Sequence, residues 1–287
     1  MLKITGKTKL LGIIGDPIEH SLSPIIQNRA LELKGLDYLY VPFAVKGEDL
    51  ATALNGFWVT GIHGFNVTIP HKQAVMPLLK HISPSALLIG AVNTVWRMAD
   101  GWHGTNTDID GFMAPLQRLN RCWQDISPLI IGNGGAARAV VVGCAKLGCK
   151  NIKVIGRNQE KLAQFKDSWD YAQLNAPIDI YTMDQLPSLI PASELIVNTT
   201  PMGMSPHSAL SPLSLSEIKL LSSCHIVYDL IYNPSPTLLL QQAQQQGATI
   251  IDGTEMLVQQ GAVGFQIWTG ETPPLEEMGR ALGDFLH

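Results

Sequence analysis

Residues 130–138 read IIGNGGAAR, a glycine-rich turn that joins an apolar run to a run of helical character. Gly132, Gly134 and Ala137 match the G-x-G-x-x-G/A pattern that opens dinucleotide-binding βαβ units. The glycines permit a tight turn and a close approach of backbone amides to a pyrophosphate, and the helix N-terminus adds partial positive charge. A plain packing turn is the alternative, but a second strand-like run, NIKVIG (151–156), follows the helix. The stretch therefore predicts a Rossmann-like nucleotide-binding domain.

The tip of that second strand indicates which nucleotide binds. Dinucleotide binders that use NAD place an acid there for the ribose 2′-hydroxyl. This chain instead reads GRNQEK (156–161), with Arg157 at the tip and Lys161 shortly after it. A guanidinium can stack on adenine and bind a 2′-phosphate through two hydrogen bonds. A surface arginine without a role is the alternative, but the position of Arg157 favours NADP.

The length and charge of the chain limit the class of protein. Its 287 residues suggest one large or two ordinary domains, at about 150 residues per domain. A content of 46% hydrophobic and 15% charged residues is typical of a globular protein with a large core. The 20 Lys and Arg are outnumbered by 24 Asp and Glu. This balance argues against nucleic acid or an anionic membrane surface as the partner.

Features of exported, membrane-spanning and metal-binding proteins are not found in the sequence. The N-terminal apolar run is interrupted by Gly12 and ends at Gly15, which is too short for a signal peptide. No run approaches the ~18 apolar residues of a membrane span. The histidines form no HExxH motif, so no metal site is expected. The four cysteines form no CxxC pair, and we interpret them as reduced packing residues of a cytoplasmic protein.

Strand-like and helix-like runs alternate along the chain, which predicts an α/β fold. Candidate strands of the first third are KLLGIIGD (9–16), YLYVPFAV (38–45), GIHGFNVTIP (61–70) and AVNTVWR (91–97). Ser23 and Pro24 are expected as N-cap and first residue of a helix that ends at Gly35. In the second unit, ELIVNTTP (194–201) and HIVYDLIY (225–232) have the continuous apolar character of buried parallel strands.

These patterns predict two domains. We expect a substrate-binding domain over residues 1–110 and a nucleotide-binding domain over residues 111–252. The segment MLVQQGAVGFQIWTG (256–270) has apolar residues at helical spacing. We therefore expect C-terminal helices over residues 253–287 that pack on the first domain.

Polar side chains are concentrated near the end of one apolar strand in the first domain. The stretch FNVTIPHK places Asn66, Thr68 and Lys72 there, where a solvated strand face and a loop lysine would be the simple interpretation. Ser21 and Ser23 lie beside an expected helix start, where hydroxyl donors and the helix dipole suit a substrate carboxylate.

Two further polar groups belong to the same domain. GAVNTV places Asn93 in an apolar, strand-like context, and GTNTDIDGF places Asn106, Thr107 and Asp108 at the expected exit to the second domain. Asp110 competes with Asp108 as the acid of this cluster, and spacing alone does not choose between them.

The chemistry of a nicotinamide-dependent dehydrogenase explains such a set of side chains. Oxidation of a secondary alcohol removes a hydride from carbon and a proton from oxygen, so a proton acceptor must lie within hydrogen-bonding reach. A lysine can serve if burial or a nearby cation lowers its pKa, or if an aspartate shares the proton. Lys72 and Asp108 are candidates for this pair, and the Asn, Thr and Ser side chains would bind a polyhydroxylated acid.

Seven motifs together resemble the shikimate dehydrogenase family over nearly the whole chain. They fall in the order of the family: GDPIEHSLSP (15–24), FNVTIPHK (65–72), GAVNT (90–94), GTNTDIDG (104–111), IGNGGAARA (131–139), VNTTPMGM (197–204) and DGTEMLVQQGA (252–262). The resemblance implies reversible NADP(H)-linked reduction of 3-dehydroshikimate to shikimate, an oxidoreductase step of aromatic amino acid and chorismate biosynthesis.

The resemblance also implies roles for individual residues. Lys72 would be the acid/base, with Asp108 as its partner. The expected substrate contacts are Ser21, Ser23, Asn66, Thr68, Lys72, Asn93, Asp108, Tyr232 and Gln260. The expected NADP contacts are Gly132, Asn133, Gly134, Gly135, Ala136, Arg157, Asn158, Lys161, Leu230 and Gly253. The phosphate clamp departs from the family's Asn-Arg-Thr, because this chain has Gly156, Arg157 and Asn158.

Three alternatives compete with this interpretation. A quinate or dual-specificity dehydrogenase would share the fold, but the serine pair and Arg157 resemble the shikimate and NADP type. A methylenetetrahydrofolate dehydrogenase would not carry the serine pair or MLVQQGA. A non-catalytic NADP sensor would be expected to lack Lys72 or Asp108. We expect a cytoplasmic monomer or homodimer that binds a small-molecule substrate.

Overall fold

The computed structural model describes residues 4–169 and 174–286 and divides into two compact units. Unit 1 consists of Met1–Asp108 with Val258–Phe285, and unit 2 consists of Ile109–Leu257. The expected boundaries lay at 110/111 and 252/253. The borders of the units instead fall inside helices α5 (Asp108–Gln117) and α11 (Gly253–Thr269), so each border lies within a continuous helix.

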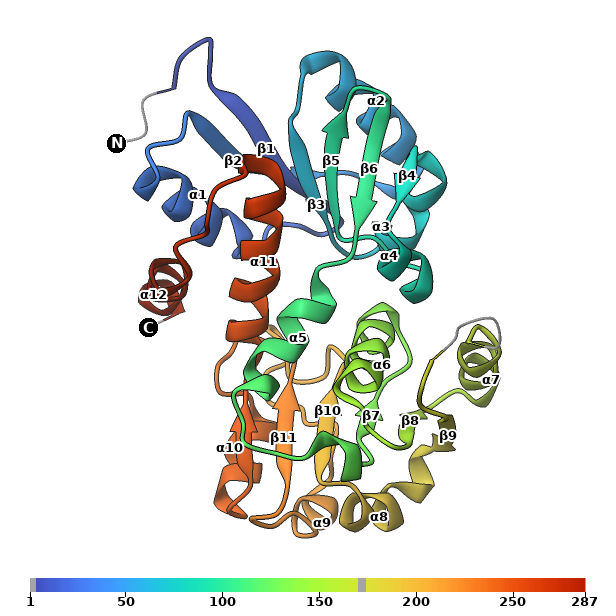
Figure 1. Cartoon of the computed structure of the whole chain (residues 1–287). Helices are drawn as coiled ribbons and strands as arrows, with labels where there is room; N and C mark the ends of the chain where they lie inside the picture. Colours follow the sequence, from blue (N-terminus) through green and yellow to red (C-terminus); the bar gives the residue numbers. More distant parts are fainter. Residues whose placement is uncertain (1–3, 170–173, 287) are drawn as a thin grey trace. The chain divides into compact units, whose positions relative to one another are not determined.

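Unit 2 is built on a fully parallel sheet (Figure 1). The strand order is β12-β11-β10-β7-β8-β9, in which β7 is central and the chain winds outward in both directions, as in a Rossmann fold. The strands are β7 (Leu129–Ile131), β8 (Ile152–Gly156), β9 (Ile178–Thr182), β10 (Leu195–Asn198), β11 (Ile226–Asp229) and β12 (Thr249–Ile251).

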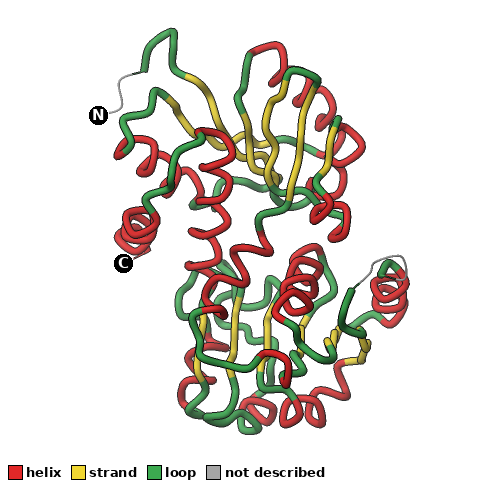
Figure 2. Tube along the Cα trace, viewed as in Figure 1, coloured by secondary structure: helices red, strands yellow, loops and turns green. Residues whose placement is uncertain are grey.

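Helices connect these parallel strands, because a parallel pair needs a crossover connection. They are α6 (Gly135–Leu147), α7 (Gln159–Asp167), α8 (Leu186–Leu189), α9 (Leu215–Ile218) and α10 (Leu238–Gln245). Figure 2 shows helices on both sides of the yellow strands of this unit. β7, β10 and β11 are buried along their whole length, which explains their continuous apolar sequences. The core beneath them includes Ile131, Ile196 and Val227.

Unit 1 contains a mixed sheet in the order β2-β1-β3-β5-β6-β4. The strands are β1 (Lys9–Gly15), β2 (Tyr38–Ala44), β3 (Gly64–Val67), β4 (His81–Ile82), β5 (Thr94–Met98) and β6 (Gly101–Thr105). β1 pairs in parallel with β2 and β3, while β5 is antiparallel to β3 and β6. In this register Asn66 of β3 lies opposite Thr94 of β5.

The helices of unit 1 cover this sheet and frame its polar residues. They are α1 (Ser23–Leu33), α2 (Leu50–Thr60), α3 (His71–Ala74), α4 (Pro84–Ile89), the later part of α11, and α12 (Leu275–Leu286). Beneath α2, the side chains of Phe65, Val67 and Val95 form part of the core. Trp268 of α11 donates a hydrogen bond to the carbonyl of Val95, 2.9 Å away. The later part of α11 thus contacts the sheet of unit 1 at Val95 of β5.

Two expectations from the sequence are wrong in detail. Ser23 is not the N-cap of α1: Leu22 occupies that position, and its side chain makes no capping hydrogen bond. Ser23 is instead the first helical residue, which leaves its hydroxyl available for other partners. Of the four cysteines, Cys144 and Cys149 are buried, but Cys122 and Cys224 are exposed and are not packing residues.

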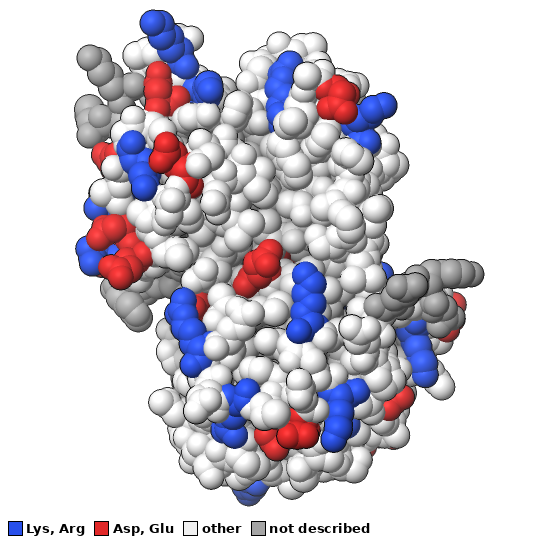
Figure 3. Space-filling view, viewed as in Figure 1, with Lys and Arg blue, Asp and Glu red and all other residues white. Residues whose placement is uncertain are grey.

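On the face drawn in Figure 3, acidic and basic side chains alternate and broad uncharged areas separate them. Within the described ranges, no helix has both the length and the apolar character needed to cross a membrane.

Candidate active site

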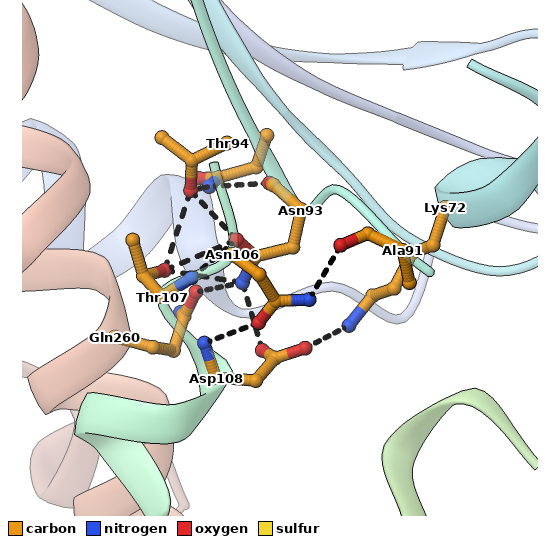
Figure 4. A network of polar contacts seen from close by, with 9 residues as sticks. Lys72, Ala91, Asn93, Thr94, Asn106, Thr107, Asp108 and Gln260 are labelled. Atoms are coloured by element: carbon orange, nitrogen blue, oxygen red, sulfur yellow. Dashed lines mark hydrogen bonds and ion pairs between the residues drawn. The ribbon is translucent and has the colours of Figure 1, made fainter. Parts of the chain in front are cut away.

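The centre of the site in unit 1 is an ion pair between Lys72 and Asp108 (Figure 4). The Lys72 Nζ lies 2.5 Å from Asp108 Oδ2, and the two side chains are 22% and 10% exposed. β3 ends at Val67, and the short helix α3 then carries Lys72 to this position. Asp108 begins α5, whereas Asp110 is exposed, so the structure selects Asp108 as the acid next to the lysine.

Asn93 holds the second oxygen of the same carboxylate. Its Nδ2 donates to Asp108 Oδ1 over 2.8 Å and also lies 3.4 Å from Gln260 Oε1. Its Oδ1 accepts from the main-chain N–H of Thr107 and from the hydroxyl of Thr94. The amide of Asn93 is thus fully engaged within the protein, and its effect is to fix the orientation of Asp108.

The chain just before Asp108 is fixed by its own side chains. Asn106 Oδ1 accepts from the N–H of Asp108, and Asn106 Nδ2 donates to the carbonyl of Ala91. Asn106, Thr107 and Asp108 are all buried. A carboxylate held by so many oriented donors keeps one geometry, which a proton-transfer site requires.

A second set of hydrogen bonds surrounds Asn66. Its Nδ2 donates to the carbonyl of Asn93 and to Thr94 Oγ1, both over 3.0 Å. Its Oδ1 accepts from the hydroxyl of Tyr40 over 2.7 Å. Burial raises the pKa of Tyr40 well above its usual value, and the side chain of Ser23 opposes this rise.

Sequence reasoning did not select Tyr40 or Thr94. A tyrosine in an apolar strand is normally a packing residue. Thr94 belongs to the motif GAVNT, in which only Asn93 was expected to have a functional role. The register of β3 against β5, which places Thr94 opposite Asn66, was the missing information. Two further residues are expected substrate contacts, Ser21 and Thr68. The N–H of Ser23 points to Ser21 Oγ over 3.4 Å. Thr68 is half-buried and follows β3.

The glycine turn in unit 2 fits a nucleotide phosphate. Gly132 has φ +111°, and a Cβ there would meet Thr199 Oγ1 at 2.6 Å, so a side chain is excluded. In contrast, a Cβ on Gly134 or Gly135 would meet no protein atom within 4 Å. These two positions lie at the start of α6 and leave open space at its N-terminus, where a pyrophosphate can approach the backbone amides. Asn133 and Ala136, the neighbours of these glycines, are half-buried.

The tip of β8 places Arg157 at the surface beside the helix start that follows. Arg157 and Lys161 are exposed. Asn158 caps α7, because its Oδ1 accepts from the N–H of Lys161 over 2.9 Å. Asn158 thereby holds the turn in which Arg157 lies, and its amide nitrogen is still able to donate to a phosphate oxygen. The residues present therefore fit NADP.

The remaining expected residues lie together in another part of unit 2. Leu230 and Tyr232 follow β11, and Gly253 begins α11. The N–H of Gly253 donates to the carbonyl of Ile231 over 3.1 Å. Tyr232 is half-buried, and burial raises its pKa.

Asp229 fixes the start of this loop. Its Oδ1 accepts from Asn198 Nδ2 over 2.9 Å and from the N–H of Ile231, while its Oδ2 accepts from the hydroxyl of Thr237 over 2.8 Å. Burial raises the pKa of Asp229 to about 6, against the lowering effect of these hydrogen bonds. Asn198 and Asp229 end adjacent parallel strands, at the edge of the sheet where ligands of such folds bind.

The fold and the site together define a dinucleotide-dependent oxidoreductase with a separate unit for the lysine–aspartate pair. Comparisons with known proteins identify the family. Residues 13–95 match the shikimate dehydrogenase substrate binding domain, and residues 253–282 match the shikimate 5′-dehydrogenase C-terminal domain. The chain belongs to the shikimate dehydrogenase family.

Individual relatives are similar over almost the whole chain. The chain is 56% identical to shikimate dehydrogenase (NADP(+)) of Gloeothece citriformis (strain PCC 7424) over 284 residues, which are 99% of each chain. A shikimate dehydrogenase solved in complex with NADP⁺ is 40% identical, with a TM-score of 0.91 and coverage of 99% of this chain and 98% of that one. Shikimate 5-dehydrogenase from Listeria monocytogenes, solved with shikimate and NAD, is 32% identical, with a TM-score of 0.88 and coverage of 98% and 99%.

Proposed function

We propose that this protein catalyses the reversible NADP(H)-linked reduction of 3-dehydroshikimate to shikimate. The observation that carries the proposal is the Lys72–Asp108 pair, whose carboxylate is held on one oxygen by the lysine and on the other by Asn93. The relatives named above are shikimate dehydrogenases, and one of them is named for NADP⁺ as its partner. The same step belongs to chorismate and aromatic amino acid biosynthesis.

Lys72 performs the proton transfer in this proposal. The nucleotide that the glycine turn would hold would supply the hydride in the direction of reduction and accept it in the direction of oxidation. As the carbonyl oxygen of the substrate gains negative charge, the Nζ of Lys72 donates a proton to it, and in oxidation the same nitrogen accepts the hydroxyl proton. Asp108 keeps Nζ in place through the ion pair, which is largely buried.

The other residues bind and orient. Ser21 and Ser23 bind the carboxylate, while Asn66, Thr68, Gln260 and Tyr232 surround the ring. Asn93 acts on the substrate through Asp108, which it orients. The glycine turn binds the pyrophosphate, and Arg157, Asn158 and Lys161 bind the 2′-phosphate. The support is the open space at Gly134 and Gly135 and the exposure of the two cations at the tip of β8. Leu230 and Gly253 line the nicotinamide with main-chain atoms.

The proposal is tested by the absorbance of reduced nicotinamide with shikimate or quinate, each with NADP or NAD. We expect turnover with shikimate and NADP to exceed all other combinations. Quinate oxidation at a comparable kcat/KM would favour a dual-specificity enzyme. Binding of NADP without turnover of either acid would favour a sensor instead.

Cell location and assembly complete the proposal. We place the protein in the cytoplasm, since its four cysteines are free, including the exposed Cys122 and Cys224. We expect a monomer or homodimer. Sedimentation equilibrium of the purified chain measures its molar mass in solution and distinguishes the two.

A further inference from the structure

Tyr40 contacts Asn66, which binds the ring of the substrate in the proposed function. Its hydroxyl donates to Asn66 Oδ1 over 2.7 Å. The two residues come from β2 and β3. Tyr40 is 1% exposed, and the centre of its ring lies 5.9 Å from that of Trp268. The hydroxyl is therefore held by the packing of its ring as well as by its partner Asn66.

The orientation of the Asn66 amide is fixed without ambiguity. The carbonyl of Asn93 can only accept a hydrogen bond, so the amide nitrogen of Asn66 faces it, and the amide oxygen faces Tyr40. The second hydrogen of this nitrogen goes to Thr94 Oγ1. Both donors of the amide and one lone pair of its oxygen are thus used within the described part of the chain.

The remaining capacity of Asn66 is one lone pair on Oδ1. A ligand group that binds Asn66 in this arrangement must donate a hydrogen bond, which a hydroxyl does and a carbonyl or carboxylate oxygen does not. The hydroxyl of Tyr40 remains the donor of this hydrogen bond over the physiological pH range, because burial raises its pKa and keeps it protonated.

We propose that Tyr40 is a positioning residue for the substrate. Its hydroxyl holds the Asn66 amide in one orientation, so that the site selects a ring hydroxyl at Asn66 and rejects an acceptor group there. The inference rests on the proposed function, because the selected group is a ring hydroxyl of shikimate other than the one that reacts.

The test compares the wild type with Tyr40→Phe, which removes the hydroxyl and keeps the ring. Steady-state kinetics at saturating NADP would use shikimate and its 4-deoxy and 5-deoxy analogues, which keep the reacting 3-hydroxyl. Tyr38→Phe is the matched control, since Tyr38 lies on the same strand, and its hydroxyl accepts from Lys9 outside this network. Thermal unfolding of each variant reports the packing.

We expect Tyr40→Phe to raise the KM for shikimate about 3–10-fold, the range for one lost hydrogen bond. The kcat and the KM for NADP should change much less, because Lys72, Asp108 and the nucleotide turn are untouched. One deoxy analogue should show a larger KM than shikimate with the wild type, and this penalty should shrink with Tyr40→Phe. Tyr38→Phe should match the wild type throughout.

Other results would overturn the inference. An unchanged KM for shikimate, or an analogue penalty equal in wild type and variant, would show that Tyr40 does not set the position of Asn66. A joint loss of kcat, NADP binding and thermal stability would show a purely structural role. A wild type that neither binds nor oxidises shikimate would instead overturn the proposed function itself, a result distinguishable from these.

A second variant covers the case in which Tyr40→Phe does not fold. Thr94→Val removes the hydroxyl that accepts from Asn66 Nδ2 and keeps the shape of the side chain. We expect the same rise in the KM for shikimate, and Thr94→Ser, which keeps the hydroxyl, should restore it. Equal KM values for the valine and serine variants would contradict a fixed Asn66 amide.

Discussion

Gly253 and Leu230 touch backbone against backbone: a Cβ on Gly253 would overlap the carbonyl oxygen of Leu230. The N–H of Gly253 is bound to the carbonyl of the next residue, Ile231. The start of α11 is therefore joined to the loop after β11, and we propose that this main chain lines the nicotinamide.

Gly253→Ala should destabilise the protein by about 1–3 kcal/mol, as overpacking does, and raise the KM for NADP. Urea unfolding and cofactor titration measure the two effects. Gly279→Ala is the control, because a Cβ in this α12 position meets nothing within 4 Å. We expect the control to be neutral or more stable, as alanine favours a helix. Equal effects of both substitutions would contradict the close contact.

Lys72→Met should lower kcat by about 10²–10⁴, the usual effect of losing a general acid/base. The pH profile of kcat should lose one ionisation. The KM for NADP should stay close to that of the wild type. Lys80→Met is the matched control, since Lys80 is exposed and outside the network. A near-normal kcat for Lys72→Met would reduce Lys72 to an ordinary loop lysine.

Arg157→Asp should weaken NADP binding through repulsion of the 2′-phosphate and spare or improve the binding of NAD. Calorimetric titration with both cofactors measures this. Lys150→Asp makes the same change in net charge at the opposite end of β8, where Lys150 is 69% exposed. Both variants should bind NAD at least as well as the wild type does. If Arg157→Asp kept an unchanged affinity for NADP, Arg157 would not bind the 2′-phosphate.

Removal of both hydroxyls in Ser21→Ala with Ser23→Ala should raise the KM for shikimate strongly, because a carboxylate loses donors at about 1–3 kcal/mol each. Since Ser23 does not cap α1, the thermal stability of the helix should change little. Ser21→Ala alone separates the contributions of the two hydroxyls. An unaltered KM in the double variant would place the carboxylate elsewhere.

Asp229 should make the stability of the protein depend on pH. Its folded pKa is raised to about 6 from an ordinary value of 3.8, so it favours the folded state when protonated. That contribution is complete below about pH 4 and is lost as the pH rises through 6, an effect of about 3 kcal/mol at 1.36 kcal/mol per unit. Asp229→Asn can keep the hydrogen bonds to Asn198 and Ile231 and donate to Thr237.

The free energy of unfolding, measured in urea between pH 4 and 8, should therefore fall less steeply with rising pH in Asp229→Asn than in the wild type. Asp125→Asn is the control, because Asp125 is 76% exposed in its side chain. The control should retain the slope of the wild type. Identical slopes for all three proteins would show that Asp229 does not titrate in this range.

Local patterns in the sequence predicted the nucleotide-binding unit well. The structure of the turn IIGNGGAAR and of the apolar strands that follow it depends on neighbouring residues in the chain and on burial of both sheet faces. Short strands such as β6, with the sequence GWHGT, and β9, with IDIYT, carried too weak a pattern to be found. Their strand character comes from their partners: β6 pairs with β5, and β9 with β8.

The sequence by itself determined which side chains this protein has for chemistry, because Lys72, Asp108 and the serine pair lie in motifs that can be read along the chain. The tertiary structure alone decided which of them meet. It selected Asp108 over Asp110, engaged the whole amide of Asn93, and brought the hydroxyl of Tyr40 to Asn66. The hydrogen bonds Tyr40–Asn66 and Lys72–Asp108 join residues that are 26 and 36 positions apart in the chain. Such contacts depend on strand register and on the placement of helices. Burial of the whole core sets both, so that no local sequence pattern predicts them.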